Sequence, residues 1–134
     1  MANYLMAVDA GTGSVRAVIF GTDGTQIGCV QQEWTHREDP RWPGSMDFDW
    51  KTNWALASGC IRGVLEKTGI APEDIAAVST TCMREGILLY DGDGNEIWAC
   101  ANVDARSDAE VGELIRMDPE LEKAVYLKSG QTYA

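Results

Sequence analysis

Three short stretches rich in apolar residues open the chain, and turn residues separate them. Residues 3–9 are apolar, residues 15–21 read Val-Arg-Ala-Val-Ile-Phe-Gly, and residues 25–34 follow Asp23-Gly24. Short apolar runs between glycine-containing turns are typical of β-strands, and Asp-Gly is a strong hairpin signal. The pattern predicts an antiparallel meander of three strands.

A polar loop and then a helix follow the meander. Residues 35–48 are polar and contain three turn-forming residues, Pro40, Pro43 and Gly44. Apolar residues then recur at helical spacing, with Asp49 as the expected N-cap and Gly69 as the expected stop. This predicts a helix through about Thr68, with the apolar positions Trp50, Trp54, Ala57, Ile61 and Leu65.

The second half of the chain continues with a strand, a hairpin and two helices. Ile75–Thr81 is the expected fourth strand, and Asp-Gly-Asp-Gly-Asn at residues 91–95 predicts a hairpin turn between Ile87–Tyr90 and Glu96–Cys100. Calcium at this turn is disfavoured, because an EF-hand loop needs glycine at its sixth position and glutamate at its twelfth.

Two helices are expected over residues 105–117 and 119–129. Asp118-Pro119 supplies an N-cap and an N1 proline for the second, and Gly130 ends it. A meander followed by an αβ crossover indicates an α/β fold of the ribonuclease H-like or actin-like type. A doubly wound dinucleotide-binding sheet would instead alternate strand and helix from the start.

Composition narrows the classes of function. The chain has 134 residues, 45% of them apolar, which is enough for a domain with a core. Its formal charge of −10 argues against nucleic acid and against anionic membrane surfaces as partners, although it does not exclude a nucleotide. No apolar run reaches the length of a membrane span, and no secretory signal is evident, so we expect a soluble, cytoplasmic protein.

The cysteine and histidine content gives no metal-binding pattern. No two of the four cysteines have Cys-x-x-Cys spacing, and His36 has no ligand companion nearby, so zinc is not expected and His36 is assigned no role. We expect reduced and mostly buried thiols, and tryptophans that belong to the core rather than to a ligand site.

The candidate chemistry lies between the first two strands. The two glycines there permit positive φ and close approach of backbone N–H groups to an anion, and two hydroxyls add donors. Asp9 ends a strand, where it could hold Mg²⁺ through water, and Arg16 could reach a phosphate oxygen. The expected phosphate-binding residues are Asp9, Gly11, Thr12, Gly13, Ser14 and Arg16.

Two familiar phosphate motifs are excluded at this turn. It lacks the Gly-Lys-Ser/Thr of a P-loop, and it lacks both the third glycine and the following helix of a dinucleotide fingerprint. A plain glycine hairpin turn remains the alternative.

Four ordered segments resemble the FGGY carbohydrate kinases, members of the sugar kinase/Hsp70/actin superfamily. The pattern Asp9-x-Gly-Thr-x-Ser-x-Arg16 is similar to the first phosphate motif of that family. Residues 43–50, with Trp54, resemble its Pro-Gly-Trp-x-Glu-x-Asp-Pro segment, and residues 81–86 resemble the strand end that carries a sugar-binding Arg-Glu pair. Asp104-x-Arg106 resembles the end of its Trp-x-Asp-x-Arg segment.

The resemblance implies ATP and Mg²⁺ as cofactors and a small sugar or polyol as substrate. Asn102 stands where many members have tryptophan, and an amide there suits a highly oxygenated ligand better than glycerol or xylulose. The sequences Met-Arg-Glu at residues 83–85 and Asn-Val-Asp-Ala-Arg at residues 102–106 most resemble members that phosphorylate a linear five-carbon quorum-sensing signal. The implied substrate-binding residues are Arg84, Glu85, Asn102, Asp104 and Arg106.

The resemblance also implies that residues 1–134 are the N-terminal part of the family's first domain. The second lobe, with the aspartate that acts as base, would lie beyond residue 134, so the chain alone is expected to be inactive and to be prone to self-association.

Several alternatives remain open from the sequence. Arg84 and Glu85 could be a surface ion pair, and Asp104 and Arg106 could cap a helix. The chain could be a non-catalytic module that binds a nucleotide or a partner weakly. It could also belong to another sugar kinase of the xylulose, ribulose or glycerol type, or to an actin-like or Hsp70-like ATPase.

Overall fold

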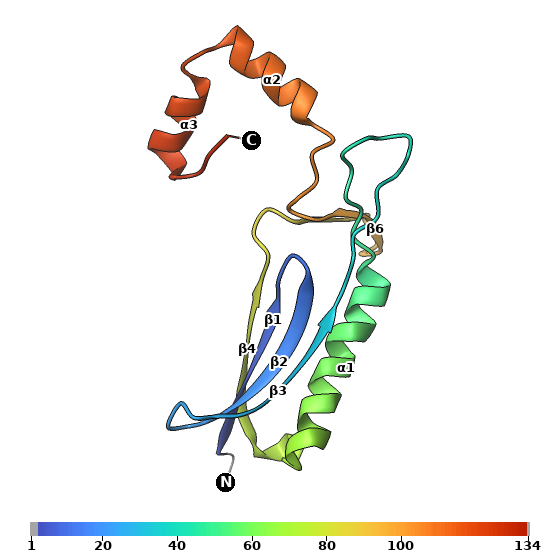
Figure 1. The fold of residues 1–134 in the computed structure, drawn as a ribbon, viewed down its shortest axis with the longest axis vertical. Helices are drawn as coiled ribbons and strands as arrows, with labels where there is room; N and C mark the ends of the chain where they lie inside the picture. The colour runs from blue at the N-terminus through green and yellow to red at the C-terminus, as the bar shows by residue number, and fades with distance from the viewer. Residues whose placement is uncertain (1–2, 134) are drawn as a thin grey trace.

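The computed structural model of the protein describes residues 3–133. Three strands come first: β1 (Tyr4–Ala10), β2 (Ser14–Gly21) and β3 (Gln26–Glu33). Helix α1 (Trp50–Thr68) and a short 3₁₀ turn, η1 (Pro72–Asp74), lead to β4 (Ile75–Cys82) (Figure 1). The expected meander and αβ crossover are therefore both present.

The four strands form one sheet in the order β3-β2-β1-β4. β1 is antiparallel to β2, β2 is antiparallel to β3, and β4 runs parallel to β1. The carboxyl ends of β1 and β4 consequently lie at the same edge of the sheet, where Asp9 is paired with Thr81 and Ala10 with Cys82. This edge brings the turn after β1 next to the segment after β4.

Helix α1 covers one face of the sheet, against β2 and β3 (Figure 1). Its ends agree with the sequence: the Asp49 side chain accepts a hydrogen bond from the Thr52 N–H, and Gly69 adopts the left-handed conformation with φ of 68°. The buried face consists of Asn53, Ala57, Cys60 and Val64. Trp54, predicted as a core residue, is 70% exposed, because the helix is rotated so that residue 53 rather than 54 faces the strands.

The core between α1 and the sheet is tightly packed. Ile19 and Val15 of β2 and Val64 of the helix are fully buried. A Cβ at Gly28 of β3 would lie only 2.5 Å from Cγ2 of Thr68. Glycine at this position thus permits the close approach of the helix end to the strand.

A hairpin and two helices follow β4: β5 (Ile87–Tyr90), β6 (Glu96–Cys100), α2 (Asp108–Met117) and α3 (Leu121–Ser129). The expected hairpin is present, and its turn is closed by the Asp91 carboxylate, which accepts hydrogen bonds from the N–H groups of Asp93 and Asn95. Gly130 ends α3 with φ of 72°, as expected.

Both C-terminal helices begin later than the sequence suggests. Helix α2 begins at residue 108 rather than 105, because the preceding residues are held in a loop by side-chain contacts described below. Helix α3 begins at residue 121 rather than at Pro119, and Asp118 is not its N-cap. The Asp118 carboxylate instead closes a local turn by accepting from the Glu120 N–H at 3.1 Å.

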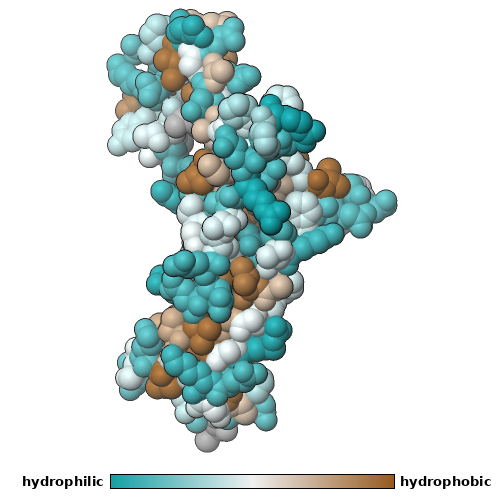
Figure 2. Space-filling view, turned by 45° about the vertical axis from the view of Figure 1, so that its right-hand side comes forward, coloured by the Kyte–Doolittle hydropathy of each residue, from teal (hydrophilic) through white to brown (hydrophobic). Residues whose placement is uncertain are grey.

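Much apolar surface stays exposed outside the main core. Most of β4 and all of β5 are exposed, and α2 and α3 bury no residue. Figure 2 shows hydrophobic side chains scattered over one face among hydrophilic ones. No helix within residues 3–133 has the length and apolar character needed to cross a bilayer.

The cysteines only partly match the expectation. All four are free, and Cys60 and Cys100 are buried, but Cys82 is exposed at the end of β4. Burial raises the pKa of the Cys60 and Cys100 thiols. Within residues 3–133 no cluster of three or more potential metal-ligating side chains occurs.

Candidate functional site

The 11–13 turn, Gly11-Thr12-Gly13, joins β1 to β2 at the sheet edge that also contains the end of β4. Neither glycine has positive φ, so the turn does not use the left-handed backbone that glycine permits. Both glycines border open space. A Cβ on Gly13 would meet nothing within 4 Å, and one on Gly11 would meet only the Ser14 carbonyl oxygen, at 3.5 Å. The two glycines leave open space on the outer side of the turn.

The carbonyl oxygens of the 11–13 turn are held on its inner side. The Trp34 indole N–H lies 3.2 Å from the Gly11 oxygen and 2.9 Å from the Thr12 oxygen, and the Trp34 backbone N–H donates to the Gly13 oxygen at 3.1 Å. His36 Nε2 lies 2.6 Å from the Thr12 oxygen. Every carbonyl of the turn therefore has a partner.

The N–H groups of the same peptides point the other way. In a planar trans peptide the C=O and N–H bonds are opposed, so the N–H groups of Thr12 and Gly13 point away from Trp34 and His36. Neither N–H donates to a carbonyl or side chain among residues 3–133. Two adjacent free N–H groups aimed outward are suited to an anion such as phosphate.

Trp34 and His36 were not identified from the sequence. Trp34 directly follows β3 and is 7% exposed, and its indole makes an edge contact with Phe48, with ring centroids 5.5 Å apart. The His36 ring also lies against Phe48, at 5.8 Å. A lone histidine in a polar loop carries no periodic or motif signal, so only the fold reveals this contact.

Asp9 and Arg16 form an ion pair beside the turn. They are directly opposite in the β1–β2 pairing, and Arg16 Nη2 and Nε lie 2.6 and 2.9 Å from Asp9 Oδ2. The pair is half-exposed, with 30% of the Asp9 side chain and 51% of the Arg16 side chain accessible. Both side chains can therefore reach solvent at the sheet edge, where the sequence placed a cation and a phosphate.

The segment after β4 is attached to the end of β1. Met83 donates its N–H to the Ala10 oxygen at 2.8 Å, which brings residues 83–86 beside the 11–13 turn. Arg84 and Glu85 are exposed, and within residues 3–133 they form no ion pair, so the alternative of a surface ion pair is not what the structure shows. Glu85 has φ of 64°, an unfavourable conformation for a residue with a side chain. Such local strain is concentrated at functional sites.

A cavity of about 270 Å³ lies between this segment and the hairpin. Its lining is mostly apolar, and it includes the end of β1 and residues on either side of Arg84 and Glu85. Its lining residues include Ala10, Phe48, Cys82, Met83, Gly86 and Leu88. None of Arg84, Glu85 and the 11–13 turn lines the cavity, but the lining residues Met83 and Gly86 flank Arg84 and Glu85 in the chain, and Ala10 precedes the turn.

Asn102 contacts the turn directly. The Thr12 hydroxyl donates to Asn102 Oδ1 at 3.0 Å, across 90 residues of sequence. The Thr12 hydroxyl, predicted as a phosphate donor, is thus bound to the residue predicted as a substrate ligand. The two halves of the predicted site meet at this hydrogen bond.

Asp104 and Arg106 organise the loop behind the site. Arg106 donates to both oxygens of Asp104 and, at 2.5 Å, to Asp47, while its guanidinium lies 5.1 Å from the Trp98 ring centre. Asp104 also accepts from the Met46 N–H at 2.6 Å. These bonds hold residues 104–106 outside the helix, so the alternative that they cap it is wrong.

In this cluster the carboxylates and the guanidinium each stabilise the charged form of the other. The Arg106 guanidinium, with burial opposing it, lowers the pKa of Asp104 to about 2. The carboxylates of Asp104 and Asp47 raise the pKa of Arg106 above its usual value. Asp104 and Arg106 are therefore both charged at neutral pH, and the cluster ties the loop before α1 to the loop before α2.

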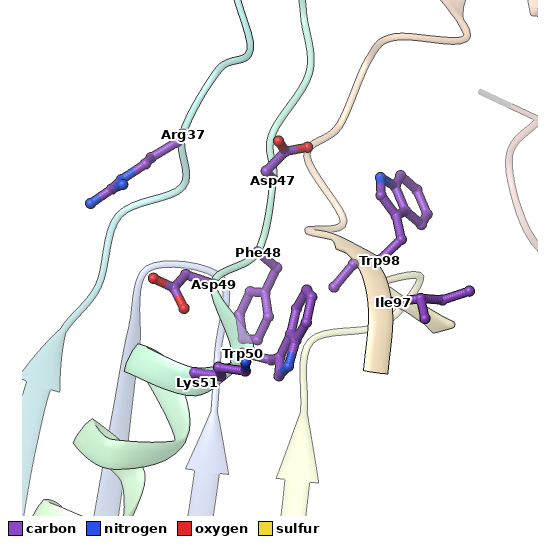
Figure 3. A pocket seen from close by; sticks show the side chains of 9 residues that line it. Arg37, Asp47, Phe48, Asp49, Trp50, Lys51, Ile97 and Trp98 are labelled. Carbon is purple, nitrogen blue, oxygen red and sulfur yellow. The ribbon is translucent and has the colours of Figure 1, made fainter. Parts of the chain in front are cut away.

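A second cavity, of about 390 Å³, lies on the other side of Phe48. Figure 3 shows Phe48 and Trp50 side by side at the start of α1, with Trp98 of β6 opposite and Asp47 above. None of the predicted site residues lines this cavity. It is a separate hollow between the helix start and the hairpin.

Comparison with known proteins gives a consistent result. The family described as "FGGY family of carbohydrate kinases, N-terminal domain" matches residues 4–134. The chain is 58% identical over 132 residues to an autoinducer-2 kinase of Escherichia coli (strain SMS-3-5 / SECEC), and this covers 98% of the chain and 25% of that protein. An autoinducer-2 kinase of Salmonella paratyphi B is 57% identical over 133 residues, with the same coverage. The chain spans about a quarter of the length of these relatives.

Solved structures agree on the fold. A gluconate kinase from Lactobacillus acidophilus superposes with a TM-score of 0.79 at 18% identity, covering 96% of this chain and 25% of its own. A xylulose kinase from Rhodospirillum rubrum gives 0.75 at 21% identity, covering 92% and 25%. The ribonuclease H-like, actin-like fold expected from the sequence is thereby confirmed. The chain belongs to the FGGY family of carbohydrate kinases, and the 11–13 turn, the strained segment after β4 and Asn102 all lie within that family's N-terminal domain.

Proposed function

We propose that this chain supplies the phosphate-binding side of an ATP-dependent sugar kinase. The observation that carries the proposal is the 11–13 turn, in which every carbonyl is held inward while two adjacent N–H groups face outward with no partner among residues 3–133. Such N–H groups stabilise the charge of a transferring phosphoryl group without needing a lysine.

Magnesium fits the residues present if the phosphates of ATP supply most of its coordination. Mg²⁺ typically keeps several waters and is held by one or two carboxylates together with substrate phosphates. Asp9 supplies one carboxylate at the edge of the turn, and its Oδ1 has no hydrogen bond within residues 3–133. When bound, Mg²⁺ would neutralise phosphate charge there. Arg16 would orient Asp9 or contact a phosphate.

Autoinducer-2 is the proposed substrate, which makes the function quorum-sensing signal processing in the cytoplasm. The support is the 57–58% identity to autoinducer-2 kinases, together with the amide of Asn102, which is hydrogen-bonded to Thr12 of the 11–13 turn. Arg84 and Glu85 would bind the ligand's oxygen atoms, since a guanidinium donates and a carboxylate accepts.

The reaction itself is proposed to require the complete product of the gene. This chain spans a quarter of the length of its relatives, and we assign the aspartate base and the adenosine site to the second lobe of the enzyme. Residues 1–134 alone would then transfer no phosphate. Exposed apolar residues of β4 and β5, such as Val78 and Leu89, would also make the isolated chain self-associate.

The test is an ADP-release assay on the complete gene product with ATP, Mg²⁺ and a panel of autoinducer-2, xylulose, ribulose and glycerol. We expect the highest kcat/KM with autoinducer-2, and preference for glycerol would contradict the substrate assignment. Phosphorylation by residues 1–134 alone would refute the division between two lobes. Monomeric light scattering of this chain over a wide concentration range would refute self-association.

The role of Asp9 is tested by comparing two variants in the same assay. Asp9→Asn should raise the Mg²⁺ concentration needed for half-maximal rate, whereas Asp93→Asn, in the distant hairpin turn, should leave it unchanged. Arg16→Gln breaks the same ion pair and serves as the second comparison. An equal Mg²⁺ response in Asp9→Asn and Arg16→Gln would show that only the ion pair matters.

A further inference from the structure

We propose that His36 and Trp34 are positioning residues that set the orientation of the 11–13 turn toward ATP. Both lie in the segment that follows β3, and neither is among the predicted substrate-binding residues. The inference deepens the proposed function and rests on it. Trp34 and His36 lie outside the phosphate motif, and we infer that they keep this motif in its binding orientation.

In the contact between His36 and Thr12, the imidazole is the hydrogen-bond donor. A carbonyl oxygen can only accept, so the 2.6 Å contact between His36 Nε2 and the Thr12 oxygen requires the proton on Nε2. His36 Nδ1 is buried and has no partner within residues 3–133, which agrees with its being the unprotonated nitrogen. The imidazole is thus held as the Nε2–H tautomer.

No other hydrogen bond within residues 3–133 restrains the peptide that carries the Thr12 oxygen. Flipping the Thr12–Gly13 peptide rotates ψ of Thr12 and φ of Gly13, and Gly13 can take the new φ because it has no side chain. The space next to Gly13 is empty within 4 Å. The hydrogen bond from Thr12 to Asn102 restrains the side chain but not the carbonyl. Among the residues that the structure describes, only the indole and the imidazole hold the Thr12 oxygen inward, at 2.9 and 2.6 Å.

The orientation of the Thr12–Gly13 peptide decides whether a donor or an acceptor faces the phosphates of ATP. If the Thr12–Gly13 peptide flipped, its oxygen would point outward and the Gly13 N–H inward. The site would then present a partial negative charge to the anionic phosphates in place of a donor. Holding the carbonyl inward therefore fixes the sign of the potential that ATP meets.

Phe48 explains how the two side chains keep their orientation. Its ring meets the Trp34 indole edge-on, at an interplanar angle of 83°, and also contacts the His36 ring. The residue preceding α1 by two positions is thus shared between the two donors. The Phe48 ring, just before α1, therefore contacts both side chains that hold the 11–13 turn.

The test compares His36→Leu, which cannot donate, with His36→Gln, whose amide N–H can reach the same carbonyl. In the complete gene product, His36→Leu should raise KM for ATP about fivefold to tenfold, the size of one lost hydrogen bond, with KM for the sugar within twofold of wild type. His36→Gln should restore KM for ATP to within about twofold of wild type, by the same comparison. Thr35→Ala, an exposed neighbour, is the matched control and should change neither KM.

A second measurement does not depend on activity. His36 is the chain's single histidine, so a long-range ¹H–¹⁵N spectrum of this protein reports its tautomer without assignment. We expect the Nε2–H tautomer at pH 7.5. The Nδ1–H tautomer would overturn the proposal.

The outcomes separate this inference from the proposed function. If wild type phosphorylates its sugar but His36→Leu leaves KM for ATP within twofold, or if His36→Gln behaves like His36→Leu, the positioning role is wrong. A fall in thermal stability without a change in KM for ATP also overturns it. If wild type phosphorylates no sugar at all, the proposed function fails, and the tautomer measurement still decides the contact.

Discussion

Replacing Asp104 by asparagine should remove a charge on which the loop before α2 depends. The carboxylate is 8% exposed and binds the Met46 N–H and the Arg106 guanidinium at 2.6 Å each. The pKa of Asp104 is lowered from 3.8 to about 2. Such a shift corresponds to at most about 2.4 kcal/mol of folding free energy at neutral pH, and screening by solvent reduces it to about 1–2 kcal/mol.

The sign of the pH dependence follows from the lowered pKa. A carboxyl whose pKa is lower in the folded state stabilises the fold fully above its unfolded pKa, near 4. The stabilisation is lost as pH falls through the folded pKa, near 2. The difference in unfolding free energy between wild type and Asp104→Asn should therefore be full at pH 7 and about half as large at pH 3.

Urea unfolding at pH 7 and pH 3 measures both quantities, and a thermal melt at pH 7 should show a decrease of about 4–8 °C. Asp93→Asn is the control, since its carboxylate accepts no hydrogen bond within residues 3–133, and it should be nearly neutral. A cost for Asp104→Asn below about 0.5 kcal/mol at pH 7 would refute the role of the ion pair, because that is the range of ordinary surface substitutions. A cost that is equal at both pH values would refute its electrostatic origin.

Three further substitutions or reactions probe the fold. Gly28→Ala places a Cβ 2.5 Å from Thr68 Cγ2 and should cost about 1–3 kcal/mol in urea unfolding; Thr68→Ser in the same chain should recover part of this, and additive effects would contradict the clash. Gly59→Ala, in a helix with nothing within 4 Å of the new methyl group, should stabilise by about 0.5–1 kcal/mol and raise Tm, and a lowered Tm would contradict the open space. Iodoacetamide should modify exposed Cys82 in the native protein well before buried Cys60, whose thiol pKa is raised by burial, and equal labelling by mass spectrometry would contradict the burial.

Local signals predicted the elements well where one residue type dictates the backbone. Asp49 and Gly69 mark both ends of α1 because a carboxylate cap and a left-handed glycine are local requirements. The same kind of signal failed at α2, since the Asp104 carboxylate binds Met46 and Arg106, and no local pattern reports a partner 58 residues away. The rotation that exposes Trp54 likewise depends on how the helix meets the sheet.

The candidate site was predicted in part for a related reason. The 11–13 turn is a continuous motif, and residues 84 and 85 form another, so each was recognisable from the sequence. The contacts that join them, from Trp34 and His36 to the turn and from Thr12 to Asn102, connect residues 22 to 90 positions apart. Only the three-dimensional fold contains that information.

The hydrogen bond between Thr12 and Asn102 also affects when the site is completed during synthesis. The turn emerges from the ribosome early, but its partner follows 90 residues later. At about 5–20 residues per second, translation takes about 5–18 s to bring the two together. During that interval the meander can already be paired while the Thr12 hydroxyl lacks its partner. The nascent chain would thus orient the backbone of the 11–13 turn first, through Trp34 and His36, and would fix the Thr12 side chain only after residue 102 has been added.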